Sequence, residues 1–174
     1  MNNINPSEWI VNQVELISKN NTISTIIDIA SGNGRHSIYF SKKGVSVVAI
    51  DKDLKKLKLY SKFTNVISIC FDLESTKFWP FNYQFDLVLV VNYLHRKHFN
   101  NILNLVKING YLIYETFAVG NEKYGKPSNR KFLLKNNELK SLLTDNFKIL
   151  DFYEGYLSKP KSSVKQRCIA KRVV

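Results

Sequence analysis

Apolar and polar residues along this chain fall into blocks whose spacing changes between that of a helix and that of a strand. Apolar residues recur three and four positions apart from Trp9 to Ile17, which predicts an amphipathic helix over residues 6–18. Two β-branched runs follow at residues 26–29 and 45–50, separated by a segment with helical spacing. This alternation is typical of a parallel sheet covered by helices.

The rest of the chain continues the same alternation. Further blocks predict a Lys-rich helix over 54–63, strands over 66–71, 86–91 and 111–117, a helix within 133–143 and two last strands over 147–156 and 164–173. The apolar run from Leu87 to Val91 indicates a strand buried on both faces, at the centre of the sheet. The polar segment SKPKSS joins the last two strands, which predicts an antiparallel hairpin. Together these segments predict an α/β fold with seven strands and helices on both faces.

The composition is that of one compact domain. With 174 residues, 44% hydrophobic and 13% aromatic, the chain can bury a core but is too short for two ordinary domains, so we expect a single domain over 1–174. The N-terminus carries no apolar run of the length of a signal peptide or membrane span, and we expect a cytoplasmic monomer or weak dimer without membrane contact. Cys70 and Cys168 lack a CxxC spacing, which favours buried free thiols over a disulfide or zinc site.

Positive charge is concentrated in the second half of the chain. The net charge is +12; residues 1–90 hold 10 Lys and Arg against 8 Asp and Glu, whereas residues 91–174 hold 16 against 6. A functional interpretation is an acidic or phosphate-bearing substrate, with nucleic acid as an alternative. The basic residues are scattered without a dense block, however, which favours a plain solvated surface.

The turn between the first two strands has the pattern of a cofactor site. Gly32 and Gly34 follow the first strand, where glycine permits a tight turn and a close approach of the backbone to a ligand. A helix is predicted over 35–43, and Asp51 ends the next strand, at about the separation from the glycines where such folds place an acid for ribose hydroxyls. Asp28 adds an acid inside the first strand. Acid, turn, helix, strand and acid in this order predict a bound cofactor.

The acid at position 28 separates two cofactor classes that share this architecture. A dinucleotide places its pyrophosphate at the turn and the helix N-terminus, where a nearby carboxylate repels it. S-Adenosylmethionine carries an ammonium and a sulfonium and no phosphate, so an acid there favours it. The dinucleotide pattern also has a third glycine where this chain has Ser37. We therefore expect S-adenosyl-L-methionine rather than NAD.

The segment DIASGNGRH resembles the first motif of class I S-adenosylmethionine-dependent methyltransferases and is similar to its variant in the tellurite-resistance-type methyltransferases. Ala30 departs from the usual motif, which has glycine there. The resemblance implies a Rossmann-like, mostly parallel sheet in which Asp28 orients the methionine part, Asp51 holds the ribose diol and Asp72 lies beside the adenine. For Asp72 the alternative is an ordinary turn residue. The cofactor-binding residues implied are Asp28, Ala30, Gly32, Gly34, Arg35, Asp51, Lys52, Asp72, Leu73 and Asn92.

Residues after the fourth strand are expected to border the transferred methyl group, because ligands of open α/β sheets bind beyond the carboxyl ends of the strands. Asn92, Tyr93 and His95 are the catalytic candidates there, with His95 as either a base or a helix-surface residue. The NYLH sequence lacks the proline motif of enzymes that methylate amino groups of DNA bases, and a Pro-Cys nucleophile is absent. His95 and His98 have no third ligand at suitable spacing, so no metal site is predicted.

A long polar loop follows the fifth strand and leaves from the same sheet edge. Its sequence YETFAVGNEKYGKP resembles the corresponding loop of the small methyltransferases named above. The substrate contacts implied are Glu115, Phe117, Asn121, Glu122 and Tyr124. For Glu122 a solvated loop position is the alternative. The N-terminal helix within 1–20 is expected to cover the cofactor cleft, with Trp9 either in this lid or in the core.

These observations predict an S-adenosylmethionine-dependent methyltransferase that acts on a small molecule by in-line displacement at the methyl carbon. Three alternatives remain. The first is a nucleic-acid methyltransferase acting on RNA, suggested by the basic second half, and the second is a module that binds the cofactor without transferring its methyl group. A dinucleotide oxidoreductase is the least favoured. The acceptor itself does not follow from the sequence.

Overall fold

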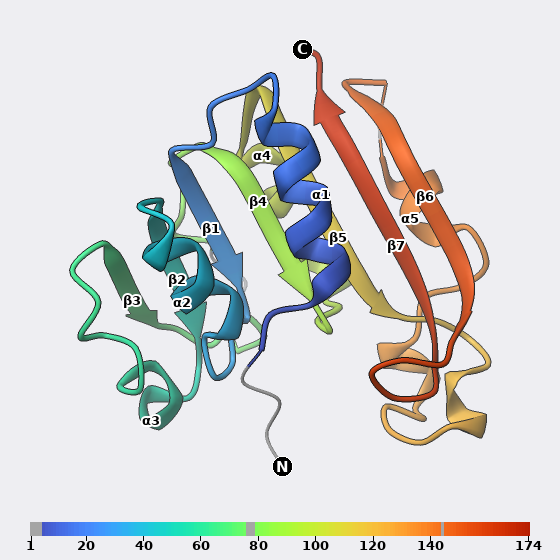
Figure 1. The fold of residues 1–174 in the computed structure, drawn as a ribbon. Coiled ribbons are helices and arrows are strands. Elements are labelled where there is room, and N and C mark those ends of the chain that lie inside the picture. The colour runs from blue at the N-terminus through green and yellow to red at the C-terminus, as the bar shows by residue number, and fades with distance from the viewer. Residues whose placement is uncertain (1–4, 76–78, 144) are drawn as a thin grey trace.

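The protein forms a seven-stranded sheet in the computed structural model, which describes residues 5–75, 79–143 and 145–174 (Figure 1). The strands are β1 (Thr25–Ile29), β2 (Ser46–Asp51), β3 (Val66–Cys70), β4 (Phe85–Val91), β5 (Val106–Phe117), β6 (Phe147–Leu157) and β7 (Ser163–Arg172). Their order is β3-β2-β1-β4-β5-β7-β6. Strands β1 to β5 pair in parallel, and β7 runs antiparallel between β5 and β6. The predicted fold, with its central fourth strand and C-terminal hairpin, is confirmed.

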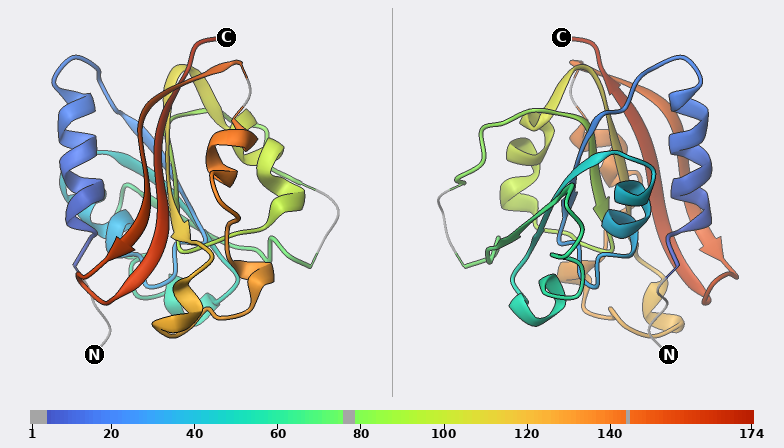
Figure 2. Two further views of the ribbon diagram at one scale, coloured as in Figure 1. Left: turned by 90° about the vertical axis from the view of Figure 1, so that its right-hand side faces the viewer. Right: turned by 60° about the vertical axis from the view of Figure 1, so that its left-hand side comes forward.

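Helices cover both faces of this sheet. They are α1 (Glu8–Ser18), α2 (Arg35–Lys42), α3 (Leu54–Leu57), α4 (Phe99–Asn104) and α5 (Glu138–Leu142), with 3-10 turns η1 (Arg96–His98), η2 (Asn121–Lys123) and η3 (Arg130–Phe132). Figure 2 shows α1 and α2 on one face and α4 and α5 on the other. Within the described part of the chain, no helix is long and apolar enough to cross a membrane.

Strand β1 explains how one sheet serves two cores. Ile26 packs with Ile10 of α1 and Phe40 of α2, whereas its neighbour Ile27 packs with Ile102 of α4 on the opposite face. Successive side chains of a strand point to opposite faces, so a strand covered on both sides must be apolar throughout. The sequence TIIDI meets this requirement at every position except Thr25 and Asp28.

The Lys-rich helix predicted over 54–63 is shorter than expected. Only Leu54–Leu57 is helical, with the carboxylate of Asp53 capping its N-terminus, and the chain continues in turns to Asn65. These turns place Tyr60, which is fully buried, against the turn between β1 and α2. Burial of this aromatic ring therefore outweighs the helix propensity of the lysines around it.

The two cysteines differ in exposure. Cys168 of β7 is buried, as predicted, but Cys70 is exposed, so the prediction of two buried thiols is wrong for Cys70. Cys70 ends β3, which is an edge strand with a neighbour on one side only. An edge position leaves the end of a strand open to solvent, which an apolar pattern in the sequence does not show.

Candidate functional site

The carboxyl ends of β1, β2, β4 and β5 meet at one edge of the sheet, where the turn between β1 and α2, here called the glycine turn, is found (Figure 1). Gly32 and Gly34 have φ angles of 56° and 70°, and Ala30 adopts 55° although it is not glycine. The Gly32 N–H donates to Oδ2 of Asp51 at 2.7 Å, and Oδ1 accepts from the Asp53 N–H at 2.9 Å. A carboxylate offers about four acceptor sites, so Asp51 keeps capacity for hydroxyl groups of a ligand.

Tyr60 supports the glycine turn. Its Oη lies 2.7 Å from Oγ of Ser31 and donates to the carbonyl oxygen of Gly32 at 3.2 Å. A Cβ added at Gly34 would lie 2.3 Å from a carbon of the Tyr60 ring. Position 34 therefore requires glycine for its backbone conformation and for this contact. The sequence did not predict the contact of Tyr60 with the glycine turn, because no local pattern links the two segments.

Asp28 points into the protein. The residue is 2% exposed and accepts a hydrogen bond from Oγ of Ser37 at 2.7 Å. Burial raises the pKa of Asp28 to about 6, against the hydrogen bond of Ser37 and the charge of Arg35, which lower it. The predicted contact of Asp28 with an ammonium group stays a prediction.

The residues predicted beside the adenine lie at the ends of β2 and β3. Oδ1 of Asp72 accepts from the Glu74 N–H at 2.9 Å, so Asp72 also has the turn-capping role that was the alternative to adenine binding. Leu73 is 4% exposed and belongs to the core. Nζ of Lys52 lies 4.0 Å from the Glu74 carboxylate. The fold thus brings Lys52, Asp72 and Leu73 together, and their contact with a cofactor stays a prediction.

Tyr93 and His95 lie near Asp72 and Glu74, in the turn after β3. Burial raises the pKa of Tyr93, and the charges of Glu74 and Asp72 raise it further, while its hydroxyl has no hydrogen-bond partner among the described residues. Burial lowers the pKa of His95, whose ring centroid is 4.9 Å from that of His98. In the described ranges no group of three or more His, Cys, Asp or Glu has a metal-binding arrangement.

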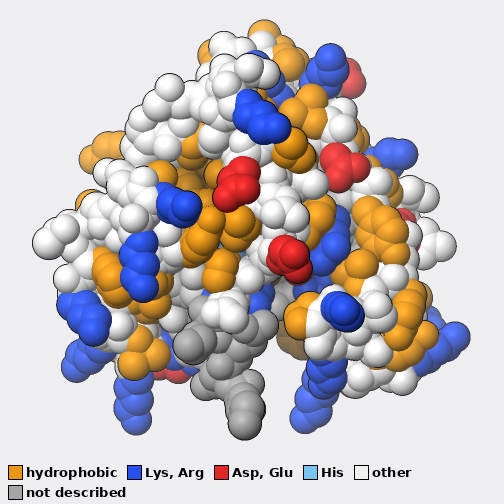
Figure 3. Space-filling view, viewed as in Figure 1, with side chains coloured by type: hydrophobic (Ala, Val, Ile, Leu, Met, Phe, Trp, Pro, Cys, Tyr) orange, Lys and Arg blue, Asp and Glu red, His pale blue; other side chains and the backbone are white. Residues whose placement is uncertain are grey.

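A cleft of about 970 Å³ opens between the start of α1, the loop after β5 and the β6–β7 hairpin. Its charged lining residues are Glu8, Arg35, Glu115, Lys126, Lys159, Lys161, Lys165 and Arg167. Trp9, Phe117 and Tyr124 add aromatic faces, and Asn92 joins from the end of β4. Figure 3 shows Lys and Arg side chains at the lower left and lower right of this face and others scattered above them. The cleft is therefore basic and partly aromatic, and it takes in Asn92 but not Tyr93 or His95.

The floor of the cleft is a network around one carboxylate. Glu115 of β5 accepts from Lys165 Nζ at 2.7 Å and from Arg167 Nε at 2.6 Å, and Lys165 also donates to Oδ1 of Asn92 at 2.7 Å. Burial on its own raises the pKa of Glu115, but the charges and hydrogen bonds of Lys165 and Arg167 outweigh it and hold this pKa below its usual range. Burial lowers the pKa of Lys165 against the opposing charge of Glu115.

Sequence analysis identified Glu115 and Asn92 but missed Lys165 and Arg167. The two cations meet Glu115 because β7 pairs with β5 in a register that sets Arg167 opposite Glu115. That register is a property of the folded sheet. The signal in the sequence was the pair of cations two positions apart in a strand, which places both side chains on one face.

The start of α1 forms one wall of the cleft. The ring centroid of Trp9 lies 4.9 Å from the guanidinium carbon of Arg167, while Ile10 packs in the core. The N–H of Ser7, just before the helix, donates to Nε2 of His36 at 3.1 Å. Burial lowers the pKa of His36 to about 3, so its imidazole is neutral and accepts this bond. Trp9 thus faces the cleft, and α1 is fixed to both the core and α2.

The loop after β5 brings Phe117, Asn121 and Tyr124 to the cleft. Asn121 is 2% exposed, and its side-chain amide bonds to backbone groups of the loop and of β7 at 2.9 and 3.1 Å. Asn121 therefore holds the loop in its conformation and links it to β7. Glu122 lies outside the lining, and its carboxylate accepts from the Gly120 N–H at 2.8 Å, which agrees with the alternative of a solvated loop residue.

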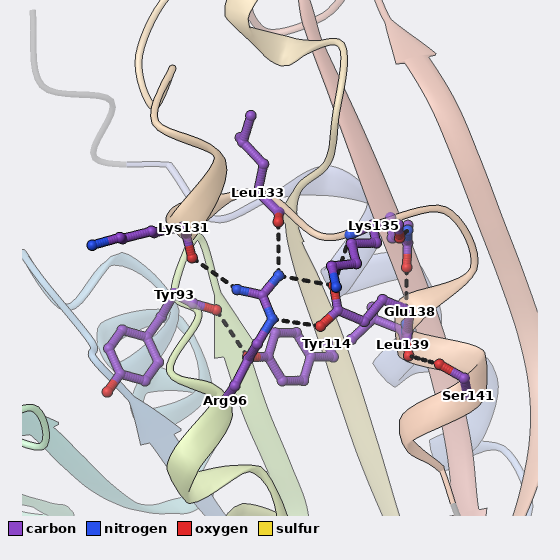
Figure 4. Close-up of polar contacts among 10 residues, drawn as sticks. Tyr93, Arg96, Tyr114, Lys131, Leu133, Lys135, Glu138, Leu139 and Ser141 are labelled. Atoms are coloured by element: carbon purple, nitrogen blue, oxygen red, sulfur yellow. Dashed lines mark hydrogen bonds and ion pairs between the residues drawn. The ribbon is translucent and has the colours of Figure 1, made fainter.

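An arginine clamp fixes the far end of this loop (Figure 4). Arg96 donates through Nε and Nη2 to the carboxylate of Glu138, and through Nη1 and Nη2 to the carbonyl oxygens of Lys131 and Leu133 at 2.8 Å each. Glu138 also accepts from the Lys135 N–H at 2.7 Å. All three guanidinium nitrogens of Arg96 are thus bonded within the protein, and segment 131–138 is held against the end of β4.

The family model described as tellurite resistance protein TehB matches residues 6–166 of this chain. A search of curated proteins finds no match. Among solved structures, TehB from Haemophilus influenzae aligns with 96% of this chain at a TM-score of 0.77 and 18% identity, and the chain spans 62% of that protein's length.

Two further structures show the same fold. A SAM-dependent methyltransferase from Methanosarcina mazei aligns at a TM-score of 0.70 and 16% identity, covering 98% of this chain and 99% of its own. The plantazolicin methyltransferase BpumL, solved with a pentazolic desmethylPZN analog and SAH, aligns at 0.69 and 14% identity, covering 93% and 81%. At such identities these structures share the fold, which agrees with the expected class I architecture.

Proposed function

Because this chain belongs to the TehB tellurite-resistance family and has the fold of S-adenosylmethionine-dependent methyltransferases, we propose that it transfers a methyl group from S-adenosyl-L-methionine to a small-molecule acceptor. The observation that carries the proposal is the position of the cleft. Its lining begins at Arg35, directly after the glycine turn, passes Asn92 at the end of β4 and reaches the loop after β5. Its volume of about 970 Å³ is that of a site for organic ligands.

The residues at the glycine turn fit this cofactor. Asp51 has acceptor sites left for a ribose diol, and a Cβ built at Gly32 meets no atom within 4 Å, so the space beside Gly32 is open to a ligand. The proposed cofactor contacts are Asp28, Ala30, Gly32, Gly34, Arg35, Asp51, Lys52, Asp72, Leu73 and Asn92. In this proposal α1 covers the methionine end of the site through Trp9, which lines the cleft.

Catalysis in this proposal rests on alignment. When bound, the cofactor would supply an electrophilic methyl carbon on a sulfonium for in-line transfer to a lone pair of the acceptor. The protein holds the acceptor at that carbon and excludes water. Asn92 is the catalytic candidate that lines the cleft, where Lys165 fixes its side-chain oxygen. Tyr93 and His95 approach from the adenine side, with His95 as a candidate base.

Nucleic acid is the second acceptor class, favoured by the lysines of the cleft, Lys126, Lys159 and Lys161. The floor of the cleft, however, is a buried ion-pair network, because Glu115, whose side chain is 3% exposed, lies there between two cations. A steep fall of RNA affinity with salt together with methyl incorporation into RNA supports the alternative. Cofactor binding without turnover on a broad acceptor panel supports a non-catalytic module.

Calorimetric titration with S-adenosylmethionine and with S-adenosylhomocysteine tests the cofactor, and a mass-spectrometric screen of small molecules and RNA for added methyl groups tests the acceptor. We expect both cofactor forms to bind and NAD not to bind. A folded protein that binds neither form contradicts the proposal. Methyl addition to RNA but to no small molecule would show that the acceptor is a nucleic acid rather than a small molecule.

A further inference from the structure

The floor of the cleft carries more positive charge than its carboxylate neutralises. Lys165 and Arg167 share the carboxylate of Glu115 there, and Arg35 is a further cation of the cleft lining. Burial lowers the pKa of Lys165 and Glu115 raises it, and the charges of Arg167 and Arg35 each lower it further, so Lys165 lies near enough to both arginines to be repelled by them. Partly buried like charges raise the free energy of a site unless an anion joins them.

Arg167 bonds to the protein through one guanidinium nitrogen, whereas all three guanidinium nitrogens of Arg96 are bonded. Its Nε donates to Glu115 at 2.6 Å, and its guanidinium stacks over Trp9 at 4.9 Å, so the group is held in one orientation from two sides. Among the described residues, Nη1 and Nη2 of Arg167 donate no hydrogen bond to the protein. The side chain is 15% exposed and faces the cleft. Two adjacent N–H groups on a fixed plane match a carboxylate or phosphate.

We propose that Arg167, fixed between Glu115 and Trp9, binds the anionic group of the methyl acceptor, which is an organic carboxylate or phosphate monoester with an aromatic part. The inference rests on the proposed function. The aromatic part follows from Trp9, Phe117 and Tyr124 in the lining.

The cofactor has a carboxylate of its own, and we assign Arg35, the cation that directly follows the glycine turn, to it. Arg35 starts α2 directly after Gly34. One carboxylate does not neutralise both Arg35 and Arg167, which sits on β7 across the cleft from α2. A protein saturated with S-adenosylhomocysteine therefore already contains the cofactor carboxylate, so an anion that binds it through Arg167 occupies a separate site.

The test uses the full chain saturated with S-adenosylhomocysteine, titrated in a calorimeter with benzoate, phenyl phosphate and benzamide. Benzamide has the shape of benzoate without its charge. We expect at least one of the two anions to bind about tenfold or more tightly than benzamide, as charged hydrogen bonds of this kind provide. Arg167→Gln is expected to remove that preference while S-adenosylhomocysteine affinity stays within about twofold of wild type. Arg130→Gln, an exposed arginine outside the cleft lining, is the matched control and is expected to keep the preference.

Three results overturn the assignment while leaving the cofactor site intact. They are equal affinity of the wild type for the two anions and benzamide, an anion preference that survives Arg167→Gln, and displacement of S-adenosylhomocysteine by the anion. Absence of S-adenosylhomocysteine binding in the wild type instead overturns the proposed function itself. The wild-type comparison of benzoate with benzamide needs no variant, so it decides the question even where Arg167→Gln does not fold.

Discussion

Asp28 is a carboxyl group whose surroundings oppose its charge. Its pKa in the folded protein is about 6, against 3.8 for the ordinary group, with burial as the main cause. The folded state therefore binds the proton more tightly than the unfolded state does. The resulting contribution to stability is full below pH 3.8 and is lost as the pH rises through about 6. At pH 7 the charged Asp28 destabilises the folded protein by about 1–3 kcal/mol.

We predict that Asp28→Asn stabilises the ligand-free protein at pH 7 by this amount, because Asn removes the buried charge and still offers an oxygen to Ser37. The gain is expected to fall to well under half at pH 4, where the carboxyl group is protonated in the folded state and only partly ionised in the unfolded state. Urea unfolding at the two pH values measures it, with the exposed Asp145→Asn as control. Equal stability of the variant and the wild type at pH 7 would contradict the prediction that the buried charge of Asp28 destabilises the folded protein.

The same substitution is predicted to weaken cofactor binding. If Asp28 is ionised to face the ammonium group, Asp28→Asn loses about 1–3 kcal/mol of affinity for S-adenosylmethionine and for S-adenosylhomocysteine. The fragment 5′-methylthioadenosine lacks the methionine part and is expected to bind both proteins equally. Calorimetry with the three ligands makes the comparison. Equal losses for all three mean that position 28 only supports the glycine turn.

Gly34 and Gly32 form a matched pair, because both have a positive φ but only Gly34 meets a side chain. We predict that Gly32→Ala costs about 1 kcal/mol, from backbone strain alone, and that Gly34→Ala costs about 3 kcal/mol or more, because its Cβ would lie 2.3 Å from the ring of Tyr60. Denaturant unfolding measures both. Similar losses for the two variants rule out the Tyr60 contact as the cause.

At the scale of whole elements, the sequence predicts what is locally encoded. The strands and α1 follow from periodicity, and the glycine turn with Asp51 follows from spacing along one unit of strand, turn, helix and strand. The end of α3 does not, because it depends on Tyr60 finding a place at that turn. Lys165 and Arg167 reach Glu115 only through the pairing of β5 with β7, so the cation-lined floor of the cleft appears in the sequence as scattered charge.

The arginine clamp is an element-scale contact with a testable role in loop order. We predict that Arg96→Lys speeds amide hydrogen exchange across residues 131–138, because lysine lacks the planar fork that reaches Glu138 and the two carbonyl oxygens at once. Arg96 is 35% exposed at its side chain, so the loss of global stability is expected to be modest, about 1 kcal/mol. Arg130→Lys is the control. Unchanged exchange in Arg96→Lys excludes the clamp as the source of loop order.

At the scale of the whole molecule, the basic second half is not only solvated surface. Arg96 belongs to the clamp, Lys107 pairs with Asp86 at 2.8 Å, and Lys165 and Arg167 lie at the cleft floor. Part of the charge excess of residues 91–174 is thus organised around internal carboxylates and one cleft. This arrangement is consistent with the small anionic acceptor that we propose, whereas a long polyanion needs a continuous exposed surface.

His36 acts on stability in the opposite direction to Asp28. Its pKa is about 3 in the folded protein against 6.5 for the ordinary group, with burial as the main cause. The unfolded state therefore binds the proton more tightly. The contribution of neutral His36 to stability is full above pH 6.5 and is lost as the pH falls through about 3. Between these values the effects of His36 and Asp28 partly cancel, so the wild-type profile hides both.

We predict that the two contributions separate in paired variants. In an Asp28→Asn background the opposing contribution of Asp28 is absent. The free energy of unfolding is then expected to fall by about 3 kcal/mol from pH 7 to pH 4, because His36 is protonated on unfolding. Adding His36→Gln is expected to flatten that fall, since the Gln amide oxygen still accepts from the Ser7 N–H and does not titrate. Urea unfolding at half-unit steps of pH measures the slopes. A slope that is the same with and without His36→Gln would show that other groups control the loss of stability in acid. The neutral imidazole of His36, which holds the start of α1 at the cleft, would then make no measurable contribution to the pH dependence of stability.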